Sequence, residues 1–388
     1  MHVDFPTSEL PNMSDHSINP ATDLAAIANE FALHGRFAGG EPYGSGHIND
    51  TFAVRFDQKD GPVRYIVQRI NHRVFKNVPA LMENIQRVTT HVSNRVGVKG
   101  TGDNLRRALA LVPARNGSSF FCDAEGGYWR CYHFIERAQT YDLVTSTRQA
   151  HEAARAFGEF QHMLVDLPGA RLHETIPDFH HTLSRFAAFR RAITNDVRAR
   201  AKQAQAEIDF ALSRESMAGV LLDLQARGEI PERITHNDTK FNNVMLDDQT
   251  GDGLCVIDLD TVMPGLALYD FGDMVRSATN SAAEDETDLS KVTMRLPIFE
   301  GLLAGYIASA GSFLNAAERA HLAFAGKLIT FEIGLRFLTD FLEGDVYFKT
   351  KRPHHNLERS RNQFALVRSI EQQECAMQTL ADSLLRQL

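Results

Sequence analysis

The hydrophobic pattern changes its period once along the chain, and this change constrains the fold more than any other feature. Phe52, Val54 and Phe56 alternate on one face of a strand predicted over 51–56. The turn-forming residues 57–61 then lead into a second predicted strand over 63–70. These segments predict a β-hairpin. A helix over 78–96 and a further strand over 129–136 follow it.

After about residue 140 the apolar residues recur at helical spacing. Residues 151–167 carry one apolar stripe, which predicts a helix facing a core. Asn315 and Glu318 have capping-box spacing at the start of a long predicted helix over 315–344. The sequence therefore predicts an α+β chain with a small β-rich N-lobe and a larger, mainly helical C-lobe. We expect a loosely ordered arm over 1–22, the N-lobe over 23–138 and the C-lobe over 139–388.

Length and composition narrow the class of protein. A chain of 388 residues with 43% hydrophobic residues is long enough for two domains or one two-lobed unit with a sizeable core. The net charge of −8 argues against a broad nucleic-acid surface, and no apolar run is long enough to cross a membrane. The four cysteines show no CxxC pair, and the first residues do not form a signal peptide. We therefore expect a cytoplasmic protein.

One polar stretch indicates chemistry. Residues 234–247, ITHNDTKFNNVMLD, place several polar side chains between apolar anchors, and such groups are costly to bury without partners. Asp238 and Asn243 are five residues apart, and Asp258 follows fifteen residues later on a predicted buried strand. Asn243 and Asp258 offer the oxygen ligands that Mg²⁺ prefers, which leaves Asp238 free to orient an attacking hydroxyl group. This set predicts a phosphoryl-transfer site.

Simpler interpretations hold for the neighbouring residues. His236 is more typical of a core imidazole that holds a loop than of a catalyst, and Lys240 and Asn242 fit a solvated charge and a cap. Asp270 lies in an Asp-Phe-Gly sequence that resembles a kinase metal motif. Its distance from Asp238 favours Asp258 for the metal, and we expect Asp270 to pair with Arg276 and brace the loop. Asp260 is either a second metal contact or a support for one.

The motifs HNDTKFNNVMLD, VIDLDTVMPGLALYDFGD and EPYGSGHINDTFAV resemble phosphotransferases of the aminoglycoside and choline kinase type. Among these, the resemblance is strongest to the bacterial N-acetylhexosamine 1-kinases, and it extends from about residue 25 onward. The resemblance implies a protein-kinase-like two-lobed fold that binds ATP and Mg²⁺. It also implies transfer of the γ-phosphoryl group to the anomeric hydroxyl of N-acetylglucosamine or N-acetylgalactosamine.

The resemblance also assigns roles to individual positions. Asp238 matches the catalytic base, and Asn243 and Asp258 match the metal ligands. The positions matching the nucleotide site are a glycine turn, a strand residue and a hinge: Gly44, Gly46, Gln68, Tyr132, Phe134 and Glu136. The positions matching the sugar site, besides Asp238, are His47, Arg336, Asp345 and Tyr347.

One departure leaves alternatives open. Gln68 stands where related kinases carry a phosphate-binding lysine, so Glu83 lacks its usual lysine partner, and Arg69 or a backbone amide is a candidate substitute. The N-acetylhexosamine kinases resemble this chain in carrying a glutamine there. A kinase for another sugar, an aminoglycoside or an amino alcohol is one alternative, and a catalytically silent pseudokinase is a second. A metal-dependent hydrolase fits less well because further metal ligands are lacking.

Overall fold

The computed structural model describes residues 20–44, 48–97 and 106–387, with side chains from Leu24 onward. The expected sites Gly46 and His47, and most of the expected arm over 1–22, lie outside the described residues. The chain forms two compact units. The first comprises the residues up to Asn71 together with Val112–Phe134, and the second comprises His72–Leu111 and Ile135–Leu388.

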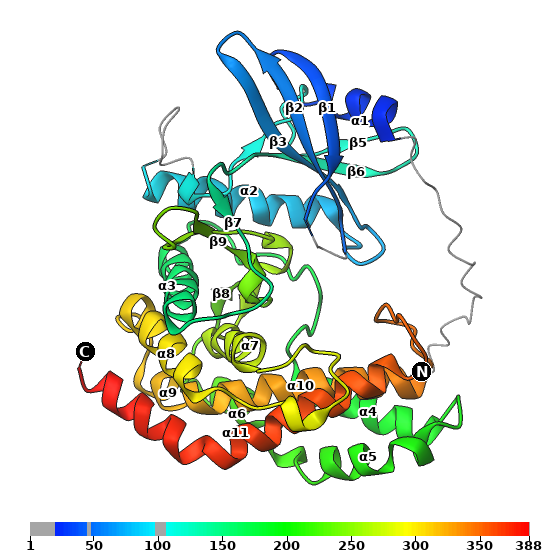
Figure 1. Ribbon diagram of the computed structural model, residues 1–388, viewed down its shortest axis with the longest axis vertical. Helices are drawn as coiled ribbons and strands as arrows, with labels where there is room; N and C mark the ends of the chain where they lie inside the picture. Colours follow the sequence, from blue (N-terminus) through cyan, green and yellow to red (C-terminus); the bar gives the residue numbers. More distant parts are fainter. Residues whose placement is uncertain (1–19, 45–47, 98–105, 388) are drawn as a thin grey trace. The chain divides into compact units, whose positions relative to one another are not determined.

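The first unit is built on an antiparallel sheet (Figure 1). Its strands are β1 (Arg36–Pro42), β2 (Asp50–Gln58), β3 (Gly61–Ile70), β5 (Phe121–Cys122) and β6 (Tyr128–His133), and β4 (Leu111–Val112) joins its edge. The order is β1-β2-β3-β6-β4, with β5 also paired to β6. The predicted hairpin is confirmed as β2–β3, since Gln58 pairs with Gly61, whose φ of +121° suits a tight turn.

Helix α1 (Pro20–Asn29) covers the core of the first unit. Val54, Phe56, Tyr65 and Val67 alternate toward this core, as the period of two predicts, and Leu24 and Phe31 pack against them. The opposite face of β3 carries Ile66 and Gln68, because side chains alternate across a strand. Gln68 therefore points away from the apolar core.

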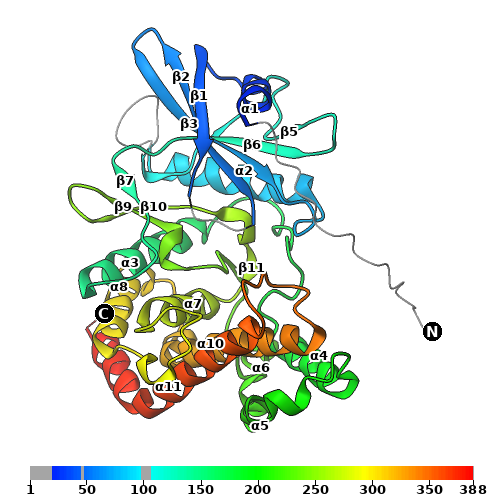
Figure 2. The same ribbon diagram turned by 45° about the vertical axis from the view of Figure 1, so that its right-hand side comes forward.

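The second unit is mainly helical. It contains α2 (Val78–Arg95), α3 (Thr147–Leu164), α4 (Thr182–Asn195), α5 (Gln205–Leu212), α6 (Val220–Ala226), α7 (Ala267–Thr279), α8 (Leu296–Ala310), α9 (Ala316–Ala320), α10 (Leu322–Glu343) and α11 (His355–Leu385). Figures 1 and 2 both show α10 and α11 side by side. Helices α3 and α8 approach closely because Gly305 lacks a Cβ, which would lie 2.0 Å from the carbonyl oxygen of His151. None of the described helices has the length and hydropathy needed to span a membrane.

Two small antiparallel ladders lie within this helical unit. One joins β10 (Gly253–Val256), β9 (Val244–Asp247) and β7 (Ala138–Gln139), and the other joins β11 (Met263–Gly265) to β8 (Arg233–Thr235). Figure 1 labels β8, and Figure 2 labels β10 and β11. Strand β8 includes the first two residues of the stretch 234–247, and β9 forms its last four. The two ladders therefore fix both ends of the loop that carries Asp238.

The structure agrees with the predicted α+β class and corrects details. The predicted boundary assigned 23–138 to the N-lobe, whereas 72–111, including α2, groups with the second unit, where α2 packs on α3. The helix expected over 315–344 is two helices. The capping box of Asn315 and Glu318 is present but belongs to α9, which ends before His321. The His321 ring bonds the carbonyl of Ala317 at 2.7 Å, and α10 starts afresh at Leu322.

Candidate active site

The Asp270 side chain holds the loop that carries Asp238 by accepting hydrogen bonds from its backbone. It is fully buried in the first turn of α7, where Oδ1 accepts the N–H of Asn237 at 2.7 Å and Oδ2 accepts the N–H of His236 at 2.8 Å. Gln161 donates to Oδ2 at 2.5 Å. Burial raises the pKa of Asp270, although these hydrogen bonds oppose the rise. Asp270 therefore supports the loop through the backbone N–H groups of His236 and Asn237.

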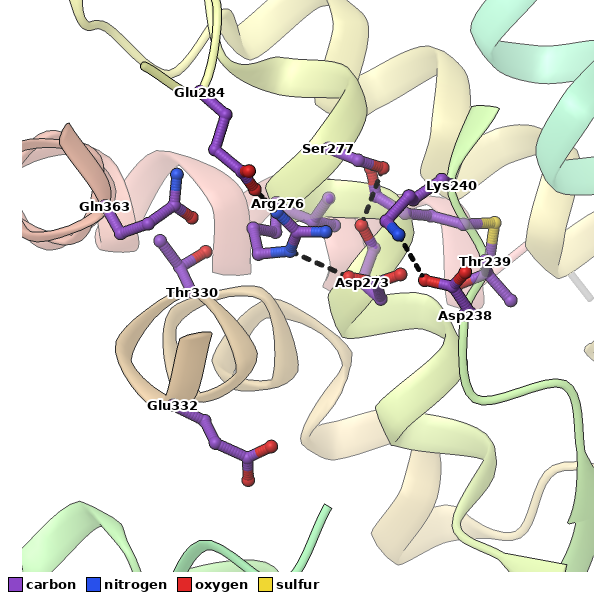
Figure 3. A network of polar contacts seen from close by, with 12 residues as sticks. Asp238, Thr239, Lys240, Asp273, Arg276, Ser277, Glu284, Thr330, Glu332 and Gln363 are labelled. Carbon is purple, nitrogen blue, oxygen red and sulfur yellow. Dashed lines mark hydrogen bonds and ion pairs between the residues drawn. The ribbon is translucent and has the colours of Figure 1, made fainter. Parts of the chain in front are cut away.

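The predicted pairing of Asp270 with Arg276 is wrong. Arg276 Nε instead donates to Asp273 at 2.7 Å, and Nη1 contacts Glu284 at 3.0 Å (Figure 3). Residues three apart lie on one face of a helix, so Arg276 shares a face with Asp273. The acidic segment 281–290 supplies Glu284 from a surface turn, and Asp270 keeps its carboxylate for the loop.

His236 holds the loop from within, as the sequence favoured. Its ring is buried and lies edge-on to Phe157, with ring centroids 5.4 Å apart. Nε2 donates to the carbonyl of Ile257 at 2.9 Å, and Nδ1 accepts the N–H of Asp238 at 3.3 Å. The imidazole therefore ties the Asp238 backbone to the chain segment that leads to Asp258.

The Asp238 carboxylate lies between two donors. Its side chain is 24% exposed, and the ammonium group of Lys240 contacts Oδ1 at 2.8 Å (Figure 3). Asn243 Nδ2 lies 3.3 Å from Oδ2 and donates to the Asp238 carbonyl at 2.8 Å. Burial acts to raise the pKa of Asp238, but the charge and hydrogen bond of Lys240 outweigh it and the pKa is lowered. Asp238 is therefore ionised at neutral pH.

Asn243 and Asp258 come together through the backbone. The N–H of Ile257 donates to the carbonyl of Asn243 at 2.9 Å, which sets Asp258 one residue from this contact. Asp258 has a φ of +58° and an exposed side chain, whereas Asn243 is 7% exposed. Because Asn243 uses its amide nitrogen on Asp238, its oxygen is the end left to ligate a cation.

This donor set fits a hard cation. Two oxygen ligands leave coordination positions for water and phosphate oxygens, as Mg²⁺ sites in kinases require. Among the described residues, no group of three or more His, Cys, Asp or Glu side chains is placed to hold a metal ion. Asp260 is 3% exposed, and its carbonyl accepts the hydroxyl of Thr175 at 2.8 Å. Its two alternative roles stay open.

The expected nucleotide residues lie mainly on the first unit. Gly44 has a φ of +82° and open space where a Cβ would stand, as the glycine turn requires. Tyr132 is 3% exposed, and the Phe134 ring lies 3.7 Å beneath the guanidinium of Arg64. In the second unit, the carbonyl of Glu136 accepts Arg106 Nε at 2.8 Å.

Gln68 has a charged neighbour that the sequence analysis missed. Arg130 stands opposite Gln68 in the β3–β6 register, is 1% exposed, and donates from Nε to Gln68 Oε1 at 2.9 Å. Gln68 in turn donates to Thr51 Oγ1 at 2.9 Å. The sequence analysis could not find this contact because only the register of β3 against β6 places residue 130 beside residue 68. Glu83 contacts His173 Nε2 at 3.0 Å.

Of the expected acceptor residues, Arg336 lies on α10, and Asp345 and Tyr347 lie in the turn after it. Glu332 and Asp340, which the sequence analysis did not name, are each four residues from Arg336 and share its face of the helix. Asp340 accepts the backbone N–H groups of residues 346–348 at 2.8, 2.8 and 2.9 Å. This turn brings Tyr347, 60% exposed, beside Arg336, whose guanidinium lies 5.8 Å from the ring centroid.

Asp345 lies in the same turn, but its carboxylate is already engaged. Arg200 contacts Oδ2 at 2.6 Å, and Asn356 donates to Oδ1 at 2.9 Å. Asp345 also has a φ of +63°. This geometry favours a role in holding the turn over a direct contact with an acceptor.

Arg185 of α4 is a second cation beside Arg336 that no sequence motif indicated. Its Nη2 donates to the carbonyl of Phe179 at 3.1 Å, while the Arg336 guanidinium lies 5.3 Å from the Phe179 ring centroid. Arg185 Nε is buried without a hydrogen-bond partner among the described residues. Burial and the charge of Arg336 lower the pKa of Arg185. Both guanidinium groups therefore contact Phe179, Arg185 at its carbonyl oxygen and Arg336 at its ring.

Comparison with known proteins gives the same fold. A family model described as "Phosphotransferase enzyme family" matches residues 39–311. An aminoglycoside phosphotransferase from Alicyclobacillus acidocaldarius superposes with a TM-score of 0.58 at 10% identity, covering 98% of this chain and 100% of that chain. A microcompartment-associated aminopropanol kinase gives 0.55 at 15% identity, covering 92% and 98%. Amicoumacin kinase in complex with AMP-PNP and Ca²⁺ gives 0.54 at 12% identity, covering 88% and 92%.

Proposed function

Because the chain belongs to the phosphotransferase enzyme family, we propose that it is an ATP-dependent, Mg²⁺-dependent kinase of a small-molecule alcohol. We propose further that the alcohol is the anomeric hydroxyl of an N-acetylhexosamine and that the product is the sugar 1-phosphate. The first proposal is supported by the site geometry. The second is supported by the motif resemblance and by the charge around Arg336.

The observation that carries the proposal is the placement of the Asp238 carboxylate. It is ionised, partly exposed and held on opposite oxygens by Lys240 and Asn243. Asn243 is joined through the Ile257 N–H to the segment bearing Asp258. A base and two oxygen ligands for a cation are the parts that phosphoryl transfer needs, because the protein mainly positions groups and neutralises charge.

The proposed step follows from these roles. The acceptor hydroxyl gives its proton to Asp238 while its oxygen forms a bond to the γ-phosphorus. The bond between that phosphorus and the β,γ-bridging oxygen breaks, and ADP leaves. A divalent cation held by Asn243 and Asp258 would neutralise charge on the phosphates. Lys240 keeps Asp238 ionised and oriented until the proton arrives.

The charge near Tyr347 favours a neutral acceptor. Arg185 and Arg336 would repel a cationic amine, whereas guanidinium groups and an aromatic face bind sugar hydroxyls and acetamido groups well. The structural neighbours include an aminopropanol kinase and an aminoglycoside phosphotransferase, so an amino alcohol or aminoglycoside acceptor is the second candidate. Arg130 argues against the alternative of a catalytically silent pseudokinase, because it places a positive charge next to Gln68, where related kinases carry a lysine.

A coupled ADP-release screen tests both levels of the proposal. The acceptors are N-acetylglucosamine, N-acetylgalactosamine, simple hexoses, an aminoglycoside, choline and aminopropanol, with the phosphorylated position read by NMR. We expect Mg²⁺-dependent turnover with the N-acetylhexosamines and phosphate on the anomeric oxygen. Turnover confined to the amines would overturn the acceptor, and no turnover with any alcohol would overturn the kinase.

A further inference from the structure

A buried His180–Glu332 pair lies directly behind the catalytic loop. The His180 side chain is 3% exposed and the Glu332 side chain is not exposed at all, and Nδ1 lies 2.8 Å from Oε1. The other ring nitrogen, Nε2, lies 2.9 Å from the carbonyl oxygen of Asn237, the residue before Asp238. Thr182 completes the group by donating its hydroxyl to Glu332 Oε2 at 2.5 Å.

The contacts and the charge together favour a doubly protonated ring. A peptide carbonyl only accepts, so Nε2 carries a proton, and an ionised carboxylate facing Nδ1 favours a second one. Burial acts to lower the pKa of His180, but the charge of Glu332 outweighs it and the pKa is raised. In Glu332 the same pairing lowers the pKa against the effect of burial. Both directions favour an imidazolium paired with a carboxylate.

The other charged groups around the pair reinforce this state or balance it. Asp273 on α7 adds negative potential at His180, and the Tyr269 ring lies 5.2 Å from the imidazole, centroid to centroid. Arg336, one turn along α10, stabilises the Glu332 charge, and Glu332 in turn acts on Arg185. Removing one partner of a buried ion pair leaves the other charge buried without compensation and strongly destabilises the fold, so His180 and Glu332 depend on each other.

The pair acts on a residue whose conformation is already restricted. Asn237 has a φ of +65°, which few residues other than glycine adopt. Its N–H binds Asp270, and its side chain bonds to Thr235 and to the carbonyl of Thr261. The carbonyl of Asn237 is the remaining polar group of the peptide that leads into Asp238. Nε2 of His180 is the donor that faces this carbonyl.

We propose that His180 and Glu332 are positioning residues, which hold the peptide between Asn237 and Asp238 so that the carboxylate faces the acceptor bound at Arg336. The inference rests on the proposed role of Asp238 as the base. Glu332 and Arg336 lie on one face of α10, so the same helix carries the acceptor contact and the loop support. Neither residue touches the reacting atoms.

The kinetic test uses Glu332→Gln, His180→Gln and a matched control. The control is His151→Gln, because His151 forms a His–Glu pair with Glu152 at 3.1 Å on α3 and its side chain is 37% exposed. We expect kcat to fall about 10- to 100-fold in the two buried variants, as for other misplaced catalytic groups, with the KM for ATP unchanged within about twofold. The control should match the wild type in both constants.

The pH profile separates positioning from a purely structural role. In the wild type, kcat should fall as His180 loses its proton at a pH above the ordinary histidine pKa of about 6.5. Glu332→Gln should move this alkaline limb to lower pH, because the carboxylate no longer raises the pKa of His180. A structural role alone would change the unfolding midpoint and leave the limb in place, and that result would overturn the proposal.

NMR of the histidine ring nitrogens gives a second measurement that needs no acceptor. The wild-type chain should show His180 protonated on both nitrogens at pH 7, and the amide signals of Asn237 and Asp238 should follow its titration. A His180 that is neutral at pH 7 would overturn the proposal, even if the variants failed to fold. If no acceptor supports turnover, the proposed function fails, while the ring signals still decide whether His180 sets this peptide.

Discussion

Replacing Asp270 by asparagine isolates the support of the catalytic loop from its chemistry. The side chain keeps its volume, but one of its two acceptor oxygens becomes an NH₂ group. If the new amide oxygen takes the place of Oδ2, the NH₂ group faces the N–H of Asn237, which bonds Oδ1 at 2.7 Å in the wild type. If the NH₂ group takes the place of Oδ2 instead, it faces the amide nitrogen of Gln161. Gln161 cannot turn its amide to accept from it, since the hydroxyl of Tyr306 donates to Gln161 Oε1 at 2.5 Å.

The expected magnitude follows from counting these contacts. One bond to a charged acceptor is lost, at about 1.5–3 kcal/mol, and the bonds from His236 and Gln161 weaken by roughly 1 kcal/mol each as the charge disappears. Burial raises the pKa of Asp270, so removing its charge returns part of this loss. We expect the free energy of unfolding of the second unit to fall by about 2–4 kcal/mol.

Urea unfolding followed by circular dichroism at 222 nm measures this loss, because most helices belong to the second unit. The single tryptophan, Trp129, lies in the first unit, so its fluorescence reports on that unit. Turnover at temperatures below the unfolding transition should fall at least about tenfold, since the loop is displaced. A change in stability below about 1 kcal/mol with normal turnover would refute the bracing role of Asp270.

Three further substitutions test separate parts of the site. Lys240→Met should raise the pKa of Asp238. Protonated Asp238 cannot act as a base, so the fall of kcat/KM at acid pH should begin at a higher pH than in the wild type. An unchanged onset of this fall would contradict the role of Lys240. Arg336→Met should raise the acceptor KM by about 10- to 100-fold, the value of a hydrogen bond to a charged group, with the KM for ATP unchanged. Equal effects on both would place Arg336 outside the acceptor site. Asp340→Asn should release the turn that carries Tyr347 and raise the acceptor KM, while thermal unfolding shows a loss of about 1–3 kcal/mol. An unchanged acceptor KM would separate this turn from binding.

The sequence predicted those parts of the fold that depend on local pattern. The alternation at Phe52, Val54 and Phe56 gave the hairpin, and the apolar stripes gave α2 and α3. The spacing of Asp238, Asn243 and Asp258 picked out residues that the structure joins through one loop and one backbone hydrogen bond. These features depend on residues that are close in the chain or on strong periodicity.

The sequence could not predict contacts between distant segments. Arg130 meets Gln68 only because β6 pairs with β3, and Arg336 meets Phe179 beside Arg185 only because α10 packs against α4. His180 lies in none of the sequence motifs, and its partner Glu332 is 152 residues away in the sequence. The wrong pairing of Asp270 with Arg276 came from neglecting Asp273, which is nearer on the same helix.

The most direct test of the central claim is the turnover of Asp238→Asn, measured by ADP release with the best acceptor. The matched control is Asp248→Asn, an exposed aspartate just after β9. Losing a positioned general base should lower kcat by about 10²- to 10⁴-fold, with unfolding and nucleotide affinity unchanged and the control fully active. Wild-type turnover in Asp238→Asn would contradict the account.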